Sequence, residues 1–395
     1  MTTVRDSHAA VRGLRAAVTL ACVAGLLVFA VPGSAVSRHA ANAAFEPFRA
    51  SFVSPTTGFV LGTRRCSTKL DTNSSATPER CSAAVMATAD AGEHWRSVPA
   101  PDTILASNQV QASLSHGHIV ISPFVSAIVF SDARNGWLYG PGLWSTHDGG
   151  IHWTRINLDR PVYAVTVAGE TAYAMTTATS DGVLRQPLLS SPVDRDDWQP
   201  VTSVTAQANA ATQPSAAFGP TVWVATGVST VASNAAQLWQ SSGGTSWQSV
   251  GYPCGRRGYI VSLAASSATN LVVSCGPRGV VYSSTAGGDH VQRAHGLMGD
   301  GGILGQLATP LGSSGVIVVS LYTESLGPSP STILRSTNGG RSMTPTRYHD
   351  NSAGFTDLQF VSPTVGLMVH GYPGGPVDEL MRTTDTGATF VPLVP

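Results

Sequence analysis

A turn motif that recurs at nearly regular spacing is the feature that most constrains the fold of this chain. Most copies contain Ser or Thr followed by Asp-x-Gly or a Gly-Gly pair, and every copy closes on an aromatic or other apolar residue. The clearest copies cover residues 87–95, 145–153 and 382–390, and the third copy is a weaker one that runs from Ser191 through Asp194 to Trp198. The closing residues of the seven copies are Trp95, Trp153, Trp198, Trp247, Val291, Met343 and Phe390. Successive copies are about 49 residues apart, and a steady period of this length indicates a repeat architecture.

Two apolar segments separated by a polar turn precede each motif. The pattern is clearest over residues 52–62, 129–140 and 360–371. A unit of about 50 residues holds four strands of ordinary length with their turns, and four-stranded units repeated around a ring make a β-propeller. We therefore predict an all-β chain: one seven-bladed β-propeller of four-stranded antiparallel blades over residues 45–395.

The residue types of the motif suit a tight hairpin. Glycines such as Gly149 supply positive φ angles, and an Asp carboxylate or an Asn amide oxygen accepts backbone N–H groups across the turn. The aromatic residue begins the next strand and offers a large apolar surface to the neighbouring unit. A carboxylate that recurs from unit to unit is expected to be structural rather than catalytic. Copies four to six lack the Asp, with Gly243, Ala286 and Asn338 near that point, so their turns are expected to be looser.

The motif resembles the Asp-box, or BNR, repeat, whose consensus is Ser-x-Asp-x-Gly-x-x-Trp. This repeat occurs in sialidases, the sortilin ectodomain, some endoglucanases and the photosystem II assembly factors, and the strand pair before each copy is closest in pattern to the last group. The resemblance implies that each box joins the third and fourth strands of a blade, on the face opposite the usual binding face. The structural box residues are Asp90, Trp95, Asp148, Gly149, Trp153, Asp194, Trp198, Trp247, Asn338, Asp385 and Phe390.

The N-terminus has the order of residues typical of an export signal. Arg5, Arg12 and Arg15 precede an apolar run over residues 16–31, and small residues follow it. We predict that residues 1–37 are a signal peptide, with a retained N-terminal anchor as the alternative, and that residues 38–44 are a short linker. The chain is then secreted or associated with the cell envelope, with no membrane span after removal of the leader.

Charge and motif content argue against several classes of function. The chain has 23 basic and 23 acidic residues, so no net charge draws it to nucleic acid. It contains no P-loop, no Gly-x-Ser-x-Gly elbow and no His-Glu-x-x-His segment. We therefore expect no nucleic-acid partner, no cofactor, no metal and no assignable catalytic residue. We also expect a monomer.

Four cysteines follow the leader, and an even number in an exported chain favours disulfides. They are Cys66, Cys81, Cys254 and Cys275. Their order suggests the pairs Cys66–Cys81 and Cys254–Cys275, although all three pairings are open from the sequence alone.

Several connections between the second and third strands of a unit are long, and so is the link between the first two units. The connections cover residues 63–84, 178–187, 323–332 and 372–379, and the link covers residues 98–126. In propellers these segments share one face, and long loops on a rigid scaffold carry recognition. The candidate binding residues there are Tyr252, Arg256, Arg257, Tyr259, Arg278, Arg347, Tyr348, His349, Asp378 and Glu379.

Three functions from different classes fit these observations. The leading hypothesis is a non-catalytic binding or scaffold module that presents its loop-rich face to a protein or a cell-envelope glycan. The second is a carbohydrate-active enzyme, glycosidase-like, that uses acidic residues at the channel mouth, for which Asp357, Asp378 and Glu379 are available. The third, an assembly factor for a membrane complex, rests on the family resemblance.

Overall fold

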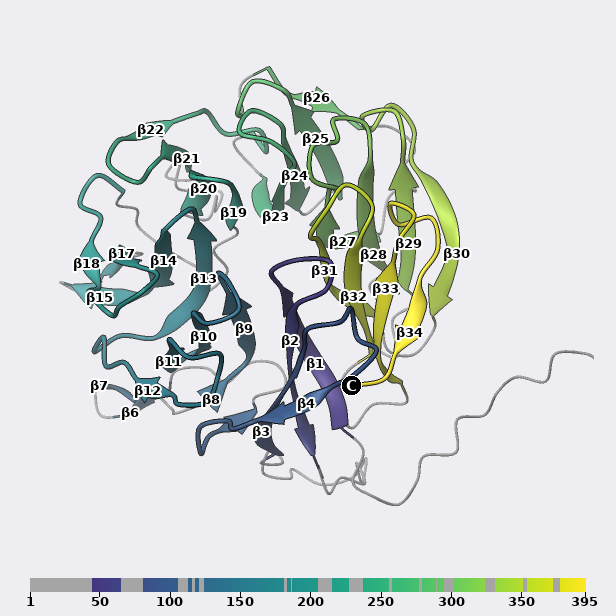
Figure 1. Ribbon diagram of the computed structural model, residues 1–395. Coiled ribbons are helices and arrows are strands. Elements are labelled where there is room, and N and C mark those ends of the chain that lie inside the picture. Colours follow the sequence, from purple (N-terminus) through teal and green to yellow (C-terminus); the bar gives the residue numbers. More distant parts are fainter. Residues whose placement is uncertain are drawn as a thin grey trace, which may run out of the picture. The chain divides into compact units, whose positions relative to one another are not determined.

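Seven antiparallel sheets follow one another along the chain and stand side by side in a ring (Figure 1). This is the predicted seven-bladed β-propeller, and no described residue is helical. Within the described part of the chain there is therefore no helix long and apolar enough to cross a membrane. The computed structural model describes residues 45–64, 81–105, 113–115, 118–120, 124–180, 183–185, 187–204, 215–226, 237–255, 258–276, 279–288, 290–294, 302–323, 331–350, 354–371 and 377–395.

Each blade is built from consecutive strands, numbered as in Figure 1. Blade 1 has β1 (Phe45–Phe52), β2 (Gly58–Arg64), β3 (Cys81–Thr88) and β4 (Arg96–Val98). Blade 2 has β9 (Ala127–Phe130), β10 (Gly136–Tyr139), β11 (Leu143–Thr146) and β12 (Thr154–Arg155). Blade 3 has β13 (Val162–Ala168), β14 (Thr171–Thr176), β17 (Leu188–Pro192) and β18 (Gln199–Pro200). Blade 4 has β19 (Ser215–Phe218), β20 (Thr221–Thr226), β21 (Gln237–Ser242) and β22 (Trp247–Ser249).

The remaining three blades repeat the pattern. Blade 5 has β23 (Tyr259–Ala265), β24 (Leu271–Gly276), β25 (Val280–Ser284) and β26 (Gln292–Arg293). Blade 6 has β27 (Gly302–Ala308), β28 (Ile317–Thr323), β29 (Ser331–Ser336) and β30 (Thr344–Asp350). Blade 7 has β31 (Phe355–Phe360), β32 (Gly366–Gly371), β33 (Asp378–Thr383) and β34 (Val391–Leu393). The additional short strands are β5 (Ile104–Leu105), β6 (Ser113–Ser115), β7 (His118–Val120), β8 (Phe124–Val125), β15 (Ala178–Ser180) and β16 (Val183–Arg185).

The position of a strand within its blade explains its residue pattern. The second strands β20 and β24 are buried along their whole length because each lies between two neighbouring sheets. The innermost strands β13 and β31 mix buried with half-buried residues instead. These innermost strands surround the centre of the ring (Figure 1), so only one of their sides is fully covered.

The hydrophobic core is divided into clusters that neighbouring blades share. Phe59 of blade 1 stacks on Phe130 of blade 2 with ring centroids 3.5 Å apart. The cluster between the first and last blades contains Ala50, Phe52, Val60, Leu367, Val369 and Leu380. Because every blade needs both neighbours to bury its two sides, the ring forms a single cooperative unit.

Among the described residues, no strand is exchanged between the first and last blades. All of β1 pairs with β2 of the same blade, and each blade takes its strands from one continuous part of the chain, with the β15–β16 hairpin inserted in blade 3. Side chains of β31 make the connection instead. The carboxylate of Asp357 accepts a hydrogen bond from the backbone N–H of Ala50, and Gln359 also bonds the backbone of β1.

The turn motif joins the third and fourth strands of every blade, as the resemblance implies. In blade 2 the Thr146 hydroxyl donates to Asp148 Oδ1 at 2.9 Å and accepts from the Gly150 N–H at 2.9 Å. Asp148 Oδ1 also accepts from the His152 N–H at 2.9 Å. The same bonds hold the turns that begin at Thr88 and Thr383.

The expectation of a looser turn in the sixth copy is wrong. Asn338 Oδ1 accepts hydrogen bonds from the Ser336 hydroxyl at 2.9 Å and from the Ser342 N–H at 3.0 Å. The Ser336 oxygen in turn accepts from the Gly340 N–H at 2.9 Å. An amide oxygen therefore does the same work as the carboxylate, because the turn requires an acceptor and not a charge.

Asp194 does not take the role expected of it in the third copy. Val193 stands two residues after Ser191, where the first, second, sixth and seventh copies have Asp or Asn. Ser191 closes this turn by donating to the Arg195 carbonyl at 2.8 Å and accepting from the Asp197 N–H at 2.9 Å. The Asp194 carboxylate is exposed and, among the described residues, approaches only Arg195, at 4.0 Å.

The closing aromatic residues pack edge-to-face on other rings. Trp198 meets Trp137 of the preceding blade with centroids 6.3 Å apart, and Trp247 meets Tyr173 at 5.6 Å. The other three pairs are Trp95 with Phe52, Trp153 with Phe130, and Phe390 with Tyr348. These aromatic side chains fill the space near the turns, where the sheets diverge.

Candidate binding sites

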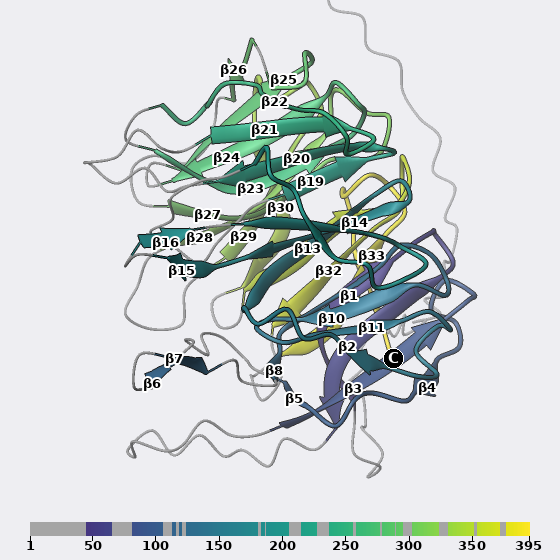
Figure 2. The same ribbon diagram turned by 90° about the vertical axis from the view of Figure 1, so that its left-hand side faces the viewer.

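One end of the blades carries the long connections, and we call this end the loop face. At this end β2 stops at Arg64 and β3 starts at Cys81. The β15–β16 and β6–β7 hairpins lie on the same side of the ring (Figure 2). Sequence reasoning identified these segments as long but missed the connection between Thr226 and Gln237. No repeat signal marks that connection.

The link between blades 4 and 5 is braced on this face by a disulfide. Cys254 on the link is bonded to Cys275 in β24, which is the pair that sequence order suggested. The Tyr252 hydroxyl donates to the Gly258 carbonyl at 3.4 Å and accepts from the Ile260 N–H at 3.2 Å. Burial raises the pKa of Tyr252. Cys66 lies outside the described residues, as does the side chain of Cys81, so their pairing stays a prediction.

Tyr259 stands beside the disulfide at the start of the innermost strand β23. It pairs with Gly276, and a Cβ at Gly276 would lie 2.4 Å from the tyrosine ring. The ring therefore rests on the glycine backbone while remaining 37% exposed. Arg256, Arg257 and Arg278, which the sequence places around the same disulfide, lie outside the described residues.

Two residues expected on a loop of this face lie in a strand and support a neighbouring turn. Residues 344–350 pair with β29, so Arg347 and Tyr348 belong to β30. The Tyr348 hydroxyl donates to the Phe390 carbonyl at 2.6 Å, and the Arg347 guanidinium lies 5.2 Å from the Tyr348 ring centre. The expectation that Arg347, Tyr348 and His349 lie on a loop is wrong, because all three belong to β30, which pairs with β29. Their role as binding residues stays a prediction.

The loop-face end of blades 6 and 7 brings a histidine between two carboxylates. His370 Nε2 lies 3.3 Å from Asp350 Oδ2, and His370 Nδ1 lies 3.5 Å from Glu379 Oε2. The imidazole also stacks on Phe355 with centroids 4.7 Å apart. Glu379 and its neighbour Asp378 were predicted at this face, whereas Asp350 and His370 were not among the predicted site residues. His349 lies next to Asp350, with Nδ1 2.8 Å from the hydroxyl of Thr332.

A second charged group lies on the inner strands of blades 7 and 1. Asp357 occupies an irregularity of β31 at a φ of 55°, and burial raises the pKa of its carboxyl while the charge of Arg49 opposes that shift. Burial, with a contribution from Asp357, also raises the pKa of Tyr139 to about 12. The bond from Ala50 assigns Asp357 to ring closure and not to a free acidic site.

Asp90, Glu93 and His94 each place one ligand atom within 4.8 Å of the others on the turn of blade 1. Asp90 Oδ2 and His94 Nδ1 already bond each other at 2.6 Å. The equivalent atoms of Asp148 and His152 are 2.7 Å apart in blade 2. The pair is therefore part of the turn, and the grouping does not by itself define a metal site.

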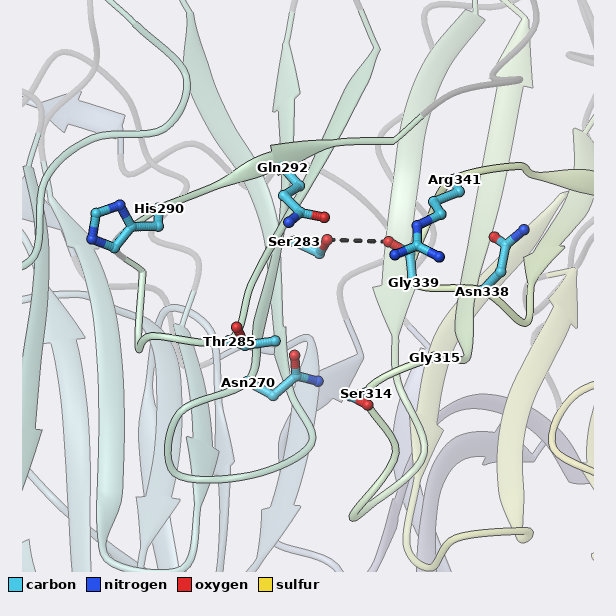
Figure 3. A pocket seen from close by; sticks show the side chains of 10 residues that line it. All are labelled: Asn270, Ser283, Thr285, His290, Gln292, Ser314, Gly315, Asn338, Gly339 and Arg341. Atoms are coloured by element: carbon cyan, nitrogen blue, oxygen red, sulfur yellow. Dashed lines mark hydrogen bonds between the residues drawn. The ribbon is translucent and has the colours of Figure 1, made fainter.

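A cavity of about 350 Å³ lies on the opposite face, between blades 5 and 6, and we call it the turn-face pocket. Figure 3 shows the Arg341 guanidinium and the Gln292 carboxamide directed toward Ser283, while the His290 ring turns away. Sequence reasoning missed this pocket. Its lining residues are Asn270, Ser283, Thr285, His290, Gln292, Ser314, Gly315, Asn338, Gly339 and Arg341.

Comparisons with solved structures agree with this architecture. YCF48 from Cyanidioschyzon merolae superposes with a TM-score of 0.52 at 14% identity, over 86% of this chain and 95% of that one. A prolyl endopeptidase structure gives a TM-score of 0.55 at 10% identity, over 89% of this chain but only 50% of that one. These likenesses show the fold alone. No family model and no curated protein matches the sequence.

The two faces thus offer different chemistry. The loop face presents an exposed tyrosine on a disulfide-braced link and an imidazole between carboxylates. The turn-face pocket presents hydroxyls, amides and one guanidinium. Both are carried by paired strands and tight turns, so the side chains are held in place before any partner arrives.

Proposed function

We propose that this chain is an exported propeller of the Asp-box type that acts by binding a protein or glycan partner through its loop face. The observation that carries the proposal is the braced link with exposed Tyr259. The Cys254–Cys275 disulfide and the two bonds of the Tyr252 hydroxyl tie the described residues of this link to one another and to the strands of blade 5. A surface ordered in advance loses little entropy on binding, and tyrosine is favoured at the centre of interfaces.

Export is part of the proposal. The disulfide is compatible with an oxidising compartment, and residues 1–37 have the order of a signal peptide. Mass spectrometry of the chain purified from its native host tests this step. A mature N-terminus near residue 38 supports cleavage, and an intact N-terminus in the membrane fraction supports the retained anchor.

The binding role is tested by affinity capture from native envelope extracts with the full chain, followed by measured affinities for each captured protein or glycan. Tyr259→Ala, and the joint replacement of Arg256, Arg257 and Arg278 by Ala, are expected to weaken binding at least about tenfold. Val391→Ala, an exposed position on the outer strand β34, is the matched control. Unchanged affinity in both loop-face variants would exclude this face as the binding surface.

Glycoside cleavage is the second candidate, and the Asp350–His370–Glu379 group favours it. Two carboxylates near one imidazole offer groups that donate and accept protons. Turnover of envelope polysaccharides that Glu379→Gln abolishes, without loss of folding, would establish this activity. Asp357 lies apart from this group, on the innermost strand β31, where its carboxylate accepts a hydrogen bond from the Ala50 N–H.

Assembly of a membrane complex is the third candidate, and it follows from the repeat pattern of the sequence. Its test is co-purification with a membrane complex from the native host. If Tyr259→Ala loses that association, the chain contacts the membrane complex through its loop face, and assembly is then one form of loop-face binding. Persistence of the association would place the contact elsewhere on the ring.

A further inference from the structure

At the turn-motif end of the blades, side chains fill the space between some neighbouring blades and leave a cavity between others. The residue directly before the Ser or Thr of a turn motif faces the turn of the next blade. Arg335 donates to the Thr386 carbonyl at 2.9 Å and to its hydroxyl at 2.6 Å. Arg382 reaches the Ala91 carbonyl at 3.4 Å in the same way. These arginines occupy the groove with their own guanidinium groups.

Blade 5 has Ser283 at the equivalent position. Its hydroxyl reaches the Gly339 carbonyl of blade 6 at 3.2 Å, so the connection between blades is kept while the volume of an arginine side chain is missing. The turn-face pocket of about 350 Å³ lies at this point. The cavity therefore lies where blade 5 has a small residue at a position that arginine occupies in blades 6 and 7.

The lining of the pocket has one charged group directed into it. Arg341 forms no hydrogen bond or ion pair with another residue in the described part of the chain, and its guanidinium faces the cavity (Figure 3). The Asn270 amide nitrogen donates a hydrogen bond to the Ser313 carbonyl at 3.0 Å. The amide oxygen of Asn270 faces the cavity (Figure 3). Among the described residues that line the pocket there is no carboxylate, and His290 carries the only aromatic ring.

This composition selects a class of ligand. A free guanidinium pairs with a carboxylate through two parallel hydrogen bonds. Amide and hydroxyl groups on several sides suit a ligand with many hydroxyls and no apolar surface. The volume is near the lower limit of about 300 Å³ for ligand pockets, which fits one or two sugar residues.

We propose that the turn-face pocket binds a uronic-acid residue of an acidic polysaccharide. Arg341 pairs with the carboxylate, while Asn270, Gln292 and Ser283 bond the ring hydroxyls. This inference goes beyond the proposed loop-face function, because the pocket is on the opposite end of the blades and shares no residue with that surface. Either site can be present without the other.

The experiment is calorimetric titration of the full chain with trigalacturonic acid, with maltotriose as the neutral ligand. We expect binding of the acidic trisaccharide only. Arg341→Gln is expected to weaken it about tenfold or more through loss of the paired charge. Ser283→Arg is expected to abolish it, because the new side chain fills the cavity as Arg335 and Arg382 fill theirs.

Ser190→Arg is the matched control. Ser190 precedes Ser191 in blade 3 and lines a separate cavity of about 240 Å³ that contains Asp197 and no arginine. This variant should bind trigalacturonic acid like the unmodified chain. If Ser283→Arg fails to fold by circular dichroism, Gln292→Ala, an exposed substitution, takes its place and should weaken binding.

Four outcomes would overturn the proposal. They are no binding of trigalacturonic acid, equal binding of maltotriose, undiminished binding by Ser283→Arg, and equal binding of a hexaglutamate peptide. The last outcome would show that the pocket recognises charge without a sugar ring. None of these outcomes bears on the partner affinity of Tyr259→Ala, so the two proposals fail separately.

Discussion

Gln359 of the last blade donates a hydrogen bond from its side-chain Nε2 to the backbone carbonyl of Ala50 in the first blade, at 2.6 Å. Its Oε1 accepts from the Phe52 N–H at 3.3 Å. One carboxamide thus satisfies two backbone groups on the free edge of β1. With Asp357, it replaces the strand exchange that could otherwise close the ring.

Gln359→Ala should destabilise the fold by about 1–3 kcal/mol, because two partly buried backbone groups lose their partner. Urea unfolding followed by tryptophan fluorescence measures the change. The control is Gln248→Ala, which removes an exposed side-chain bond to Gln240 within blade 4. That control should shift the free energy of unfolding by no more than about 0.5 kcal/mol. Equal losses in the free energy of unfolding for the two variants would contradict a role of Gln359 in ring closure.

Asp357 should make the stability of the closure depend on pH. Burial raises the pKa of its carboxyl. The contribution of Asp357 to the free energy of unfolding is therefore fully present below the ordinary pKa of an aspartate and is lost as the pH rises through the pKa in the folded chain. Asp357→Asn keeps an acceptor for the Ala50 N–H and carries no charge. The urea midpoint of Asp357→Asn should therefore rise relative to the unmodified chain between pH 4 and pH 7. A difference in urea midpoint between the two chains that stays constant from pH 4 to pH 7 would contradict a raised pKa for Asp357.

Asp148 should show the opposite dependence. The hydrogen bond from the His152 backbone, followed by that from its side chain, lowers the pKa of Asp148 to about 2 from 3.8. The contribution of the ionised carboxylate is present above the ordinary value and is lost as the pH falls through about 2. Asp148→Asn should make the protection factor of the His152 amide, which is its exchange rate relative to the intrinsic rate at each pH, constant over this range, since Asn338 performs the same function in blade 6. Asp194→Asn is the control, because no backbone N–H among the described residues bonds its carboxylate.

The Cys254–Cys275 disulfide closes a loop with a sequence separation of 21 residues. Its removal should cost about 3 kcal/mol on the chain-entropy estimate for a loop of this size. Unfolding of Cys254→Ser/Cys275→Ser, compared with the unmodified chain in the absence of reductant, measures this loss. Addition of reductant should lower the stability of the unmodified chain more than that of the double variant, in which only the predicted Cys66–Cys81 pair can still be reduced. A similar response from both would point to another reducible bond.

The sequence predicted the repeat number and the turn chemistry because both are local. In the Thr146–Trp153 copy the donor, the acceptor and the glycines lie within eight successive residues, so their pattern can be recognised in the sequence before the fold is known. Sequence order suggested the Cys254–Cys275 pair, although it left the other pairings open. Local pattern failed at Asp194, which stands one residue too late, and at Arg347 and Tyr348, whose strand pairing no sequence signal indicated.

The candidate sites depend on residues from different blades. His370 meets Asp350 across the boundary between blades 6 and 7, and the turn-face pocket exists because Ser283 faces a turn of the next blade. The sequence by itself determined a ring of seven units, since each unit carries its own strands and turn. Only the tertiary structure decided how the ring closes and where a cavity remains. The pocket depends on residues 56 positions apart and the closure on residues 307 and 309 positions apart. Such residues become neighbours only when the blades pack against one another.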